Sequence, residues 1–310
     1  MTENTINLSE EKETLILCDS IVKIYKTKEI EVMALQGLDL EIKKGEIISI
    51  IGKSGSGKST LMNIIGGLEK PSAGRIVVSG QNLAEKNDKE MNSYRKKTVG
   101  FVWQKSARNL FPYLTSLENI EAAMNFTGLK NKEKKNRALT LLEMVGMSHK
   151  RDSYPAQMSG GEQQRIAIAV ALANDPEILL ADEPTGAVDT KTSNMIQDLF
   201  RKLNRELNLT IIIVTHDMKL ANKVDRVVMI SDGKISTEKV MKEQYREKMD
   251  SMASDELLEE YHEEYSVLDK AHRVQLNDDM LEAAGIDTNK VKITIEDGKL
   301  IITGENTEQN

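Results

Sequence analysis

The apolar and polar positions of the chain group into short, almost continuously apolar segments and longer segments with helical spacing. Residues 47–51, 178–181 and 210–214 are rich in β-branched and aliphatic side chains, as in strands that are buried on both faces of a sheet. Between them, apolar residues recur at helical spacing over 160–173 and 190–207. Because strands that alternate with helices form mostly parallel sheets covered by helices, we predict an α/β fold.

The remaining part of the first 150 residues contains weaker patterns. Alternation over Leu38–Ile42 indicates a strand with one buried face, and Arg75–Ser79 follows a turn and indicates another strand. Residues 116–150 indicate helices that are interrupted near Gly128 and Gly146. We expect these segments to form further strands and helices beside the predicted parallel sheet.

After residue 234 the composition changes, which indicates a domain boundary. Residues 235–310 carry 19 Asp and Glu against nine Lys and Arg, whereas residues 1–234 have a small excess of bases. Residues 235–265 are dense in charge, with Met, Leu and Tyr at helical spacing; they favour a surface or linker helix, with a partner-docking helix as the alternative. The pattern beyond predicts, in order, a strand at 272–277, a short helix at 280–284, and strands at 291–295 and 299–302 joined by an Asp-Gly turn.

The composition disfavours several classes of protein. Its 39% hydrophobic and 29% charged residues are typical of a globular domain, and the longest apolar stretches are far too short to cross a bilayer. The polar N-terminus carries no signal peptide, and Cys18, the single cysteine, allows neither an internal disulfide nor a cysteine-rich metal site. The acidic tail disfavours binding of nucleic acid through its phosphates. We therefore expect a cytoplasmic protein that does not bind nucleic acid.

Directly after the first buried strand, residues 52–59 fit the phosphate-loop pattern G-x-x-x-x-G-K-[ST]. Its glycines let successive backbone N–H groups turn toward phosphate oxygens, and the helix that follows adds the positive end of its dipole. Lys58 is expected to neutralise the β- and γ-phosphates, and the Ser59 hydroxyl to ligate Mg²⁺. A flexible turn with a chance lysine does not account for the strand and the helix on either side. The predicted nucleotide-binding residues of this loop are Gly52, Lys53, Ser54, Gly55, Ser56, Gly57, Lys58, Ser59 and Thr60.

A second candidate for chemistry stands where the strand at 178–181 ends. Asp182 and Glu183 follow this strand directly, and the carboxyl ends of strands are where α/β sheets bind ligands. Asp182 is expected to hold Mg²⁺, directly or through water, and Glu183 to act as general base on the attacking water. Two adjacent acids at a strand end also suit a solvated turn, so this interpretation depends on the phosphate loop.

Between these two motifs, residues 158–165 have the sequence Met-Ser-Gly-Gly-Glu-Gln-Gln-Arg. This segment resembles the L-S-G-G-Q signature peptide of ABC ATPases, and the resemblance covers residues 15–234. It implies a phosphate-loop NTPase core of ABC type, with a mostly parallel sheet, an antiparallel β subdomain and a helical subdomain. It also implies ATP hydrolysis. Met158 stands in place of the usual leucine, which conserves volume.

Four further residues match motifs of this family. Tyr25 resembles the aromatic residue that stacks on adenine, and Gln104 the Q-loop glutamine, which reaches Mg²⁺ and the γ-phosphate and links to the membrane partner. Asp189 lies in a segment similar to the D-loop, and His216 resembles the switch histidine that contacts the γ-phosphate. Without the resemblance, Tyr25 would suit a packed ring and His216 a strand-end cap.

In this family the signature peptide of one cassette faces the phosphate loop of a second cassette. The resemblance therefore implies a homodimer with two ATP molecules at its interface. Ser159, Gly160 and Gly161 would contact the γ-phosphate that the partner binds, and a hydroxyl followed by two glycines at a helix start suits an anion. Glu162 completes the nucleotide-binding residues predicted for this segment. It stands where glutamine is usual and adds a negative charge, a change that would act against ATP-driven closure.

The architecture also narrows the subclass. Only 106 residues separate Gly52 from Met158, against hundreds in chromosome-maintenance ATPases, and the chain has one cassette and no membrane helices. Segments 61–68, 71–74 and 114–120 resemble the MacB, LolD and FtsE group, whose members pair with a four-helix permease. This resemblance implies a subunit at the cytoplasmic face of the membrane that powers such a permease, in export or extraction of peptides, antibiotics or lipoproteins. Import, for example of amino acids, and FtsE-like regulation of cell-wall machinery stay open.

The order of elements in the tail resembles the AbrB/MazE swapped-hairpin module, which dimerises by interleaving strands. Because this copy is acidic, we expect a dimerisation or regulatory unit in place of a DNA-binding one, with a plain stabilising appendage as the alternative. The predicted organisation is a flexible N-terminus at 1–13, an ABC ATPase domain at 14–234, a charged helical linker at 235–268, an AbrB-like dimerisation module at 269–304 and a disordered end at 305–310.

Overall fold

The computed structural model describes most of the chain, and the described residues fall into two compact units. The first unit runs through Tyr265 and the second begins at Ser266. The described residues are 13–26, 30–104, 109–186, 188–221, 223–242, 245 and 261–304. The predicted disordered end at 305–310 and the predicted flexible N-terminus, apart from Glu13, lie outside this part.

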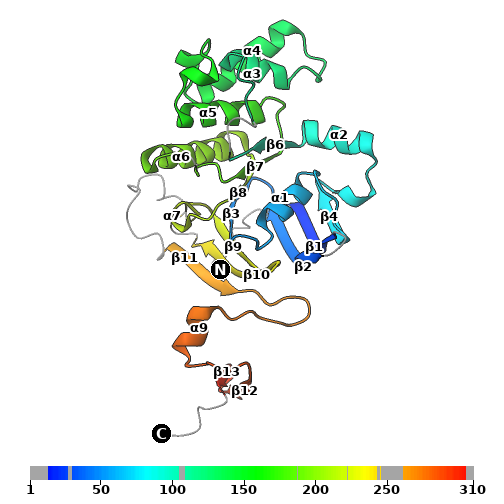
Figure 1. Ribbon diagram of the computed structural model, residues 1–310, viewed down its shortest axis with the longest axis vertical. Helices are drawn as coiled ribbons and strands as arrows, with labels where there is room; N and C mark the ends of the chain where they lie inside the picture. Colours follow the sequence, from blue (N-terminus) through cyan, green and yellow to red (C-terminus); the bar gives the residue numbers. More distant parts are fainter. Residues whose placement is uncertain are drawn as a thin grey trace, which may run out of the picture. The chain divides into compact units, whose positions relative to one another are not determined.

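A seven-stranded sheet forms the centre of the first unit (Figure 1). Its strands, in spatial order, are β11 (His262–Ser266), β10 (Lys234–Met241), β9 (Arg226–Ser231), β3 (Ile47–Ile51), β8 (Thr210–Val214), β7 (Ile178–Asp182) and β6 (Val99–Val102). The strands from β9 to β6 pair in parallel, and β10 pairs antiparallel with β9. All five residues of β3 and of β8 are buried, which confirms the prediction of central strands covered on both faces.

A separate antiparallel sheet of four strands accompanies this parallel sheet. Its spatial order is β2 (Glu31–Lys43), β1 (Thr14–Lys26), β4 (Ala73–Val78) and β5 (Gln81–Asn82). In β2 the alternating residues Leu38, Leu40 and Ile42 are buried, as their pattern predicts. Two sheets of different type, with helices between and around them, confirm the predicted phosphate-loop NTPase architecture.

Helices cover the parallel sheet and form a further group at one end of the unit. They are α1 (Lys58–Ile65), α2 (Asp88–Lys97), α3 (Ser116–Ala123), α4 (Asn131–Met144), α5 (Gly160–Ala171), α6 (Thr190–Leu207) and α7 (Met218–Ala221). Figure 1 shows α3 and α4 gathered away from the blue strands β1, β2 and β4. None of the helices in the described part of the chain has the length and apolar character of a membrane span.

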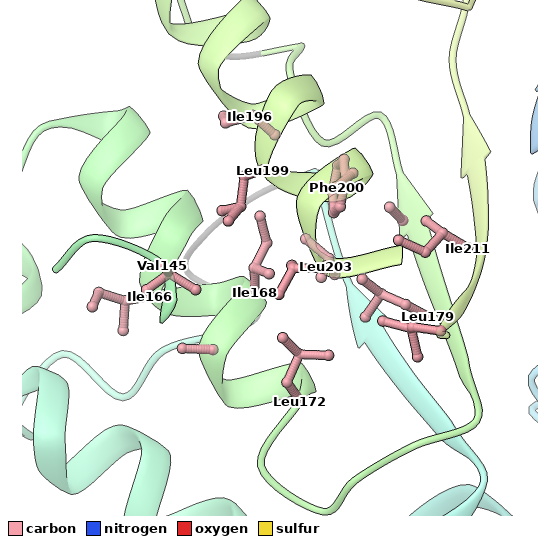
Figure 2. Close-up of a cluster of buried hydrophobic side chains, with 14 of the residues drawn as sticks. Val145, Ile166, Ile168, Leu172, Leu179, Ile196, Leu199, Phe200, Leu203 and Ile211 are labelled. Atoms are coloured by element: carbon pink, nitrogen blue, oxygen red, sulfur yellow. The ribbon is translucent and has the colours of Figure 1, made fainter. Parts of the chain in front are cut away.

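The main apolar core lies where α5 and α6 pack on the sheet (Figure 2). Ile168 from α5 faces Leu199 and Leu203 from α6, and Leu179 and Ile211 extend this cluster into the sheet. Phe200 is fully buried in the same cluster, in a chain with few aromatic residues. This packing fixes α5 and α6 against the strands whose ends carry the candidate site.

The predicted helix over residues 235–265 is wrong at 235–241 and at 262–265. Residues 234–241 form β10, which pairs antiparallel with β9, and residues 262–266 form β11 at the edge of the same sheet. Ile235 and Met241 are buried, and β10 forms a hairpin with the preceding strand β9 through Asp232 and Gly233, which both have positive φ, so this turn and the pairing decide the conformation. The first compact unit therefore extends beyond residue 234, to Tyr265.

The second unit is small and has little buried apolar surface. It consists of α9 (Asp278–Ala283) and a hairpin of β12 (Val291–Glu296) and β13 (Lys299–Gly304), as predicted. Asp297 and Gly298 form its two-residue turn, both with positive φ, which matches a type I′ turn. The strand predicted at 272–277 is absent as a strand, because no neighbouring strand in the described chain supplies a ladder for it.

Candidate functional site

A pocket of about 360 Å³ opens where β3, β7 and β8 end. Carboxyl ends of adjacent parallel strands meet at one edge of the sheet, so the loops that follow these three strands converge there. The described lining consists of Ala34, Gly52, Ser54, Gly55, Gly57, Lys58, Ser59, Thr60, Asp182, Glu183, Val214 and His216. The structure thus gathers the phosphate loop, the two carboxylates and the candidate switch histidine in one place.

Close backbone packing holds the phosphate loop in shape. Gly52 has a φ of 153°, and a Cβ there would lie 2.2 Å from the carbonyl oxygen of Ile230. Gly57 has a φ of 105°, and a Cβ there would lie 2.5 Å from the carbonyl oxygen of Ala34. Both positions therefore require glycine on steric grounds. Gly57 is also the N-cap of α1 and offers no side-chain acceptor, so the first N–H groups of α1 receive no side-chain cap from it.

Lys58 extends its ammonium group back into the loop. Its Nζ donates to the carbonyl oxygens of Gly52, at 2.8 Å, and of Lys53, at 2.9 Å. Burial lowers the pKa of Lys58, and the carboxylates of Glu183 and Asp182 act in the opposite direction. The cation therefore lies near both the loop and the two acids, where it would attract an anionic ligand.

Glu183 is held by its backbone and by two side chains. Its φ of 46° places a non-glycine residue in the left-handed region, and its N–H donates to the carbonyl oxygen of Val214 at 2.8 Å. His216 Nδ1 lies 2.8 Å from Glu183 Oε1, and the Thr215 hydroxyl donates to Oε2 at 3.4 Å. The hydrogen bond and charge of Glu183 raise the pKa of His216, because they favour the imidazolium.

Tyr25 lies beside the pocket and is not part of its described lining. Its hydroxyl donates to Glu69 Oε2 at 2.7 Å and lies 3.4 Å from the Thr60 hydroxyl. The Lys23 ammonium lies 5.0 Å from the ring centroid and 3.2 Å from the Glu69 carboxylate. These contacts fix the ring next to the phosphate loop, with 39% of the residue exposed.

Gln104 and Asp189 also lie outside the described lining of the pocket. Gln104 Nε2 is 3.0 Å from the position that a Cβ on Gly186 would take, so its side chain packs against the segment that follows Glu183. Asp189 is the N-cap of α6: its carboxylate accepts the Thr192 N–H at 3.0 Å and the Thr192 hydroxyl at 2.7 Å.

The signature residues form the start of α5, and the described lining of the pocket does not include them. Ser159 is the N-cap: its hydroxyl accepts the Glu162 N–H at 3.3 Å, and its own N–H donates to Glu162 Oε2 at 2.8 Å. Ser159 and Gly160 are exposed. Gly161 is buried, and a Cβ there would lie 2.2 Å from Thr192 Cγ2.

The sequence patterns do not predict several residues that contribute to these sites. Thr215 bonds to Glu183, and its position at a strand end beside His216 could have indicated it. Ala34 lines the pocket from β2, and no local pattern marks it. Lys150 forms an ion pair with Glu162 at 3.2 Å, a contact that depends on how residues 148–158 fold between them.

Comparison with known proteins gives the family of this domain. Residues 35–186 match the family model described as ABC transporter. An ABC transporter ATP-binding protein of Thermotoga maritima is 46% identical over 224 residues, which cover 72% of this chain and 94% of that protein. The lipoprotein-releasing system ATP-binding protein LolD 1 of Chlorobium chlorochromatii is 44% identical over 209 residues, which cover 67% and 84%.

A solved structure agrees with these sequence matches. The dimeric structure of the ATP-binding cassette MJ0796, in a post-hydrolysis state with ADP and Pi, is 41% identical and superposes with a TM-score of 0.67. The match covers 73% of this chain and 98% of that one. With the phosphate loop, the paired acids and the signature helix in place, this chain belongs to the ABC transporter ATP-binding family and is an ATPase of that type.

Proposed function

We propose that two copies of this chain close around two ATP molecules and power a separate MacB-type permease that exports or extracts peptides, antibiotics or lipoproteins. The observation that carries the proposal is a division of the site. The phosphate loop, Asp182, Glu183 and His216 share one pocket, whereas the signature residues are displayed on α5 outside the described lining. The names of similar proteins, LolD and a macrolide export protein MacB, support the export class.

In this proposal the phosphate loop binds the triphosphate of ATP. Backbone N–H groups of residues 52–60 and the start of α1 point to the phosphate oxygens, and Lys58 moves from the loop carbonyls to the β- and γ-phosphates. Ser59, Asp182 and Gln104 would hold Mg²⁺, because hydroxyl, carboxylate and amide oxygens are the ligands this ion prefers. When bound, the ion draws negative charge from the phosphate oxygens. Tyr25, fixed beside the loop, would stack on adenine.

Glu183 acts as the general base of hydrolysis. Its carboxylate takes a proton from the attacking water, the water oxygen bonds to the γ-phosphorus, and the bond to the leaving ADP oxygen breaks. In the structure the same carboxylate pairs with His216 at 2.8 Å. Because His216 is expected to contact the γ-phosphate, binding of ATP would draw the imidazole away and release Glu183 to the water.

The second copy completes the site. Ser159 and Gly160 are exposed at the start of a helix, and helix starts bind anions. The backbone N–H groups of Gly160 and Gly161 and the Ser159 hydroxyl would contact the γ-phosphate held by the partner, and Asp189 would cap α6 beside them. The dimeric state of the related cassette MJ0796 supports this arrangement.

Exposed apolar side chains on the helical part of the unit support docking to a membrane partner. They lie in the segments on either side of α3 and before α5, with two of them in ring contact: Phe111, Tyr113, Phe126, Leu129 and Tyr154. Large apolar side chains in solvent are unusual for a monomer when several occur in one region, and they suit a protein interface. The chain would then reside at the cytoplasmic face of the membrane through this permease.

The second unit is proposed as an AbrB-like dimerisation module. Its sheet has only two strands, and isolated two-stranded hairpins are marginally stable in water. Ile293, Ile295 and Leu300 are 59%, 76% and 72% exposed, and the segment 272–277 lacks a ladder within the described chain. A second copy would supply the missing strands and would raise the effective concentration of one cassette near the other.

The main test is Glu183→Gln in the full chain. We expect hydrolysis to fall by about 10² to 10⁴, as for loss of a general base, and an ATP-bound dimer to accumulate in size-exclusion chromatography. Glu206→Gln is the matched control, because Glu206 is an exposed carboxylate near the end of α6 and is not among the residues that line the pocket. Brisk hydrolysis by the Glu183→Gln variant would refute the assignment of the base.

Capture of the membrane partner tests the transport class. A permease with a large extracytoplasmic domain that co-purifies with the full chain and stimulates its ATPase supports the MacB-type proposal. The similarity to the methionine import protein MetN 1 of Enterococcus faecalis, 43% identical over 220 residues, favours import as the alternative. A stimulating permease that takes up substrate from outside would establish that alternative.

Deletion of residues 267–310 tests the tail. This cut keeps β10 and β11, which belong to the main sheet. We expect the truncated chain to lose dimerisation in the absence of ATP. An unchanged dimer and an unchanged ATPase rate in the complex with the permease would sink this part of the proposal.

A further inference from the structure

The signature helix carries a negative charge beside the place proposed for the partner's γ-phosphate. Glu162 is the third residue of α5, within the first turn, and Ser159 and Gly160 precede it at the exposed start. A carboxylate at a helix N-terminus interacts favourably with the same dipole that would attract a phosphate. Left alone, Glu162 would therefore both repel the incoming nucleotide and compete for its site.

We infer that Lys150 is a positioning residue for ATP-driven dimer closure, because its ammonium neutralises Glu162 and holds that carboxylate back against the start of α5. This inference rests on the proposed ATP-bound dimer. It assigns to Lys150 no contact with ATP: the residue acts through Glu162 and through the shape of the signature segment.

Both oxygens of the Glu162 carboxylate have a partner within the chain. Lys150 Nζ lies 3.2 Å from Oε1, and the Ser159 N–H donates to Oε2 at 2.8 Å. The two side chains of the ion pair are mostly shielded, with 26% of Lys150 and 19% of Glu162 exposed. The pKa of Glu162 is lowered, first by the Ser159 N–H and further by Lys150, so the carboxylate stays ionised and paired.

The origin of Lys150 in the chain gives the pair its geometric effect. Lys150 ends a short 3₁₀ turn at Ser148–Lys150, which follows α4, whereas Glu162 lies on α5. The ion pair therefore joins the segment after α4 to the first turn of α5. With the carboxylate turned back in this way, the Ser159 hydroxyl accepts the Glu162 N–H and also bonds to the Glu162 carboxylate. The N–H of Gly160 lies at the exposed start of the helix, where an anion outside the chain can reach it.

The neighbouring cation provides a matched comparison. Arg151 pairs with Asp152 at 2.8 Å, and both side chains are largely exposed. It carries the same charge one residue further along but does not contact the signature segment among the described interactions. Loss of Arg151 thus changes the net charge of the region as much as loss of Lys150 and leaves Glu162 paired.

The experiment measures the ATP concentration that gives half-maximal dimer in the Glu183→Gln background, by analytical ultracentrifugation of the full chain with Mg-ATP. We expect Lys150→Met to raise this concentration about tenfold, since an uncompensated carboxylate then faces the nucleotide. Arg151→Met should change it by less than about twofold, because exposed pairs contribute little. Raising the salt to about 0.5 M should narrow the defect of Lys150→Met, because the repulsion is screened.

The double variant Lys150→Met/Glu162→Gln distinguishes charge compensation from a structural tether. Glutamine keeps an oxygen that can accept the Ser159 N–H and removes the charge, so we expect the double variant to return to within about twofold of the parent. A double variant as weak as Lys150→Met alone would overturn the inference, as would a single variant that matches the parent. A parent that forms no dimer with ATP would contradict the proposed function itself.

Discussion

Two helices of this cassette begin at positions that we propose to bind phosphate, and they begin in different ways. Helix α1 follows Gly57, which supplies no side-chain cap, and its start lies in the pocket with Lys58. Helix α5 follows Ser159, which forms a capping box with Glu162, and its start is exposed. The N–H groups at the start of α1 have no side-chain cap and can bind a ligand held by the same chain. The start of α5 is capped within the chain and is stable without a ligand.

This difference explains how a single chain can fold completely and still be an incomplete enzyme. The start of α1 has its cation and carboxylates within reach, so it is prepared to bind a nucleotide in the monomer. The N–H of Glu162 at the start of α5 is bonded and its carboxylate is neutralised, so this start is stable in water without the nucleotide that we propose it contacts on another copy. Perturbing α1 should therefore affect binding by the monomer, and perturbing α5 should affect the dimer alone.

The largest expected effect comes from Gly57→Ala, which distorts the phosphate loop at the start of α1. A methyl group would lie 2.5 Å from the Ala34 carbonyl oxygen at a φ of 105°, so the loop must shift. We expect ATP affinity to fall at least about 100-fold and the free energy of unfolding by about 2–4 kcal/mol. Titration with a fluorescent ATP analogue and chemical denaturation measure the two quantities.

Gly55→Ala is the control for that prediction, because Gly55 shares the positive φ but a Cβ there meets nothing within 4 Å. Only the backbone strain remains, about 1–2 kcal/mol. If Gly55→Ala weakens ATP binding as much as Gly57→Ala, then close packing against Ala34 is not what shapes the loop.

A smaller effect is expected from Gly161→Ala, which perturbs the first turn of α5. The added Cβ would lie 2.2 Å from Thr192 Cγ2, so the start of α5 must move away from α6. In the Glu183→Gln background we expect ATP-driven dimerisation to weaken about tenfold, or about 1.4 kcal/mol, with ATP affinity of the monomer within about twofold. Sedimentation and nucleotide titration separate these two readouts.

Thr192→Ser provides the rescue for Gly161→Ala. Serine removes Cγ2 and keeps the hydroxyl that donates to Asp189 at 2.7 Å. The double variant should regain most of the dimer affinity. Weaker nucleotide binding by the Gly161→Ala monomer would contradict the separation between nucleotide binding at α1 and dimerisation at α5.

The sequence was most informative where one segment contains the whole signal. Residues 190–207 were predicted as a helix, and α6 has these bounds because Asp189 caps its start and Asn208 ends it in the left-handed region. The phosphate loop was equally clear, since its strand, glycines and helix are contiguous. Seven of its nine predicted residues, all but Lys53 and Ser56, line one pocket with Asp182 and His216, as expected for parallel strands that end at one edge.

Prediction failed at two places for different reasons. Residues 234–241 open the range predicted as a helix but form a strand, because the Asp232–Gly233 turn folds them back onto β9 as a hairpin. The pairing of Lys150 with Glu162 depends on how the residues between them fold, so the sequence pattern does not show the counter-ion of Glu162. The roles given to Tyr25 and Gln104 stay predictions, because both lie outside the described lining of the pocket.

The smallest expected effect concerns Glu183, the proposed base, in the chain without nucleotide or partner copy. The hydrogen bond to Glu183 raises the pKa of His216, so the folded chain holds this proton more tightly than the unfolded chain. The stabilisation is then complete below about pH 6.5 and is lost as the pH rises through the higher folded value. Because the imidazole is largely exposed, we expect less than about 1 kcal/mol and a Tm change of at most about 2–4 °C.

The measurement compares thermal unfolding at about pH 6 and about pH 9 for the parent chain and for His216→Gln. The parent should lose more stability than the variant as the pH rises, since only the parent forms the charged pair. His149→Gln is the control, because His149 bonds to no carboxylate among the described contacts. An equal difference between parent and His216→Gln at both pH values would mean that Glu183 is not engaged by a charged His216 in the resting chain, and that the base is available to water before any nucleotide binds.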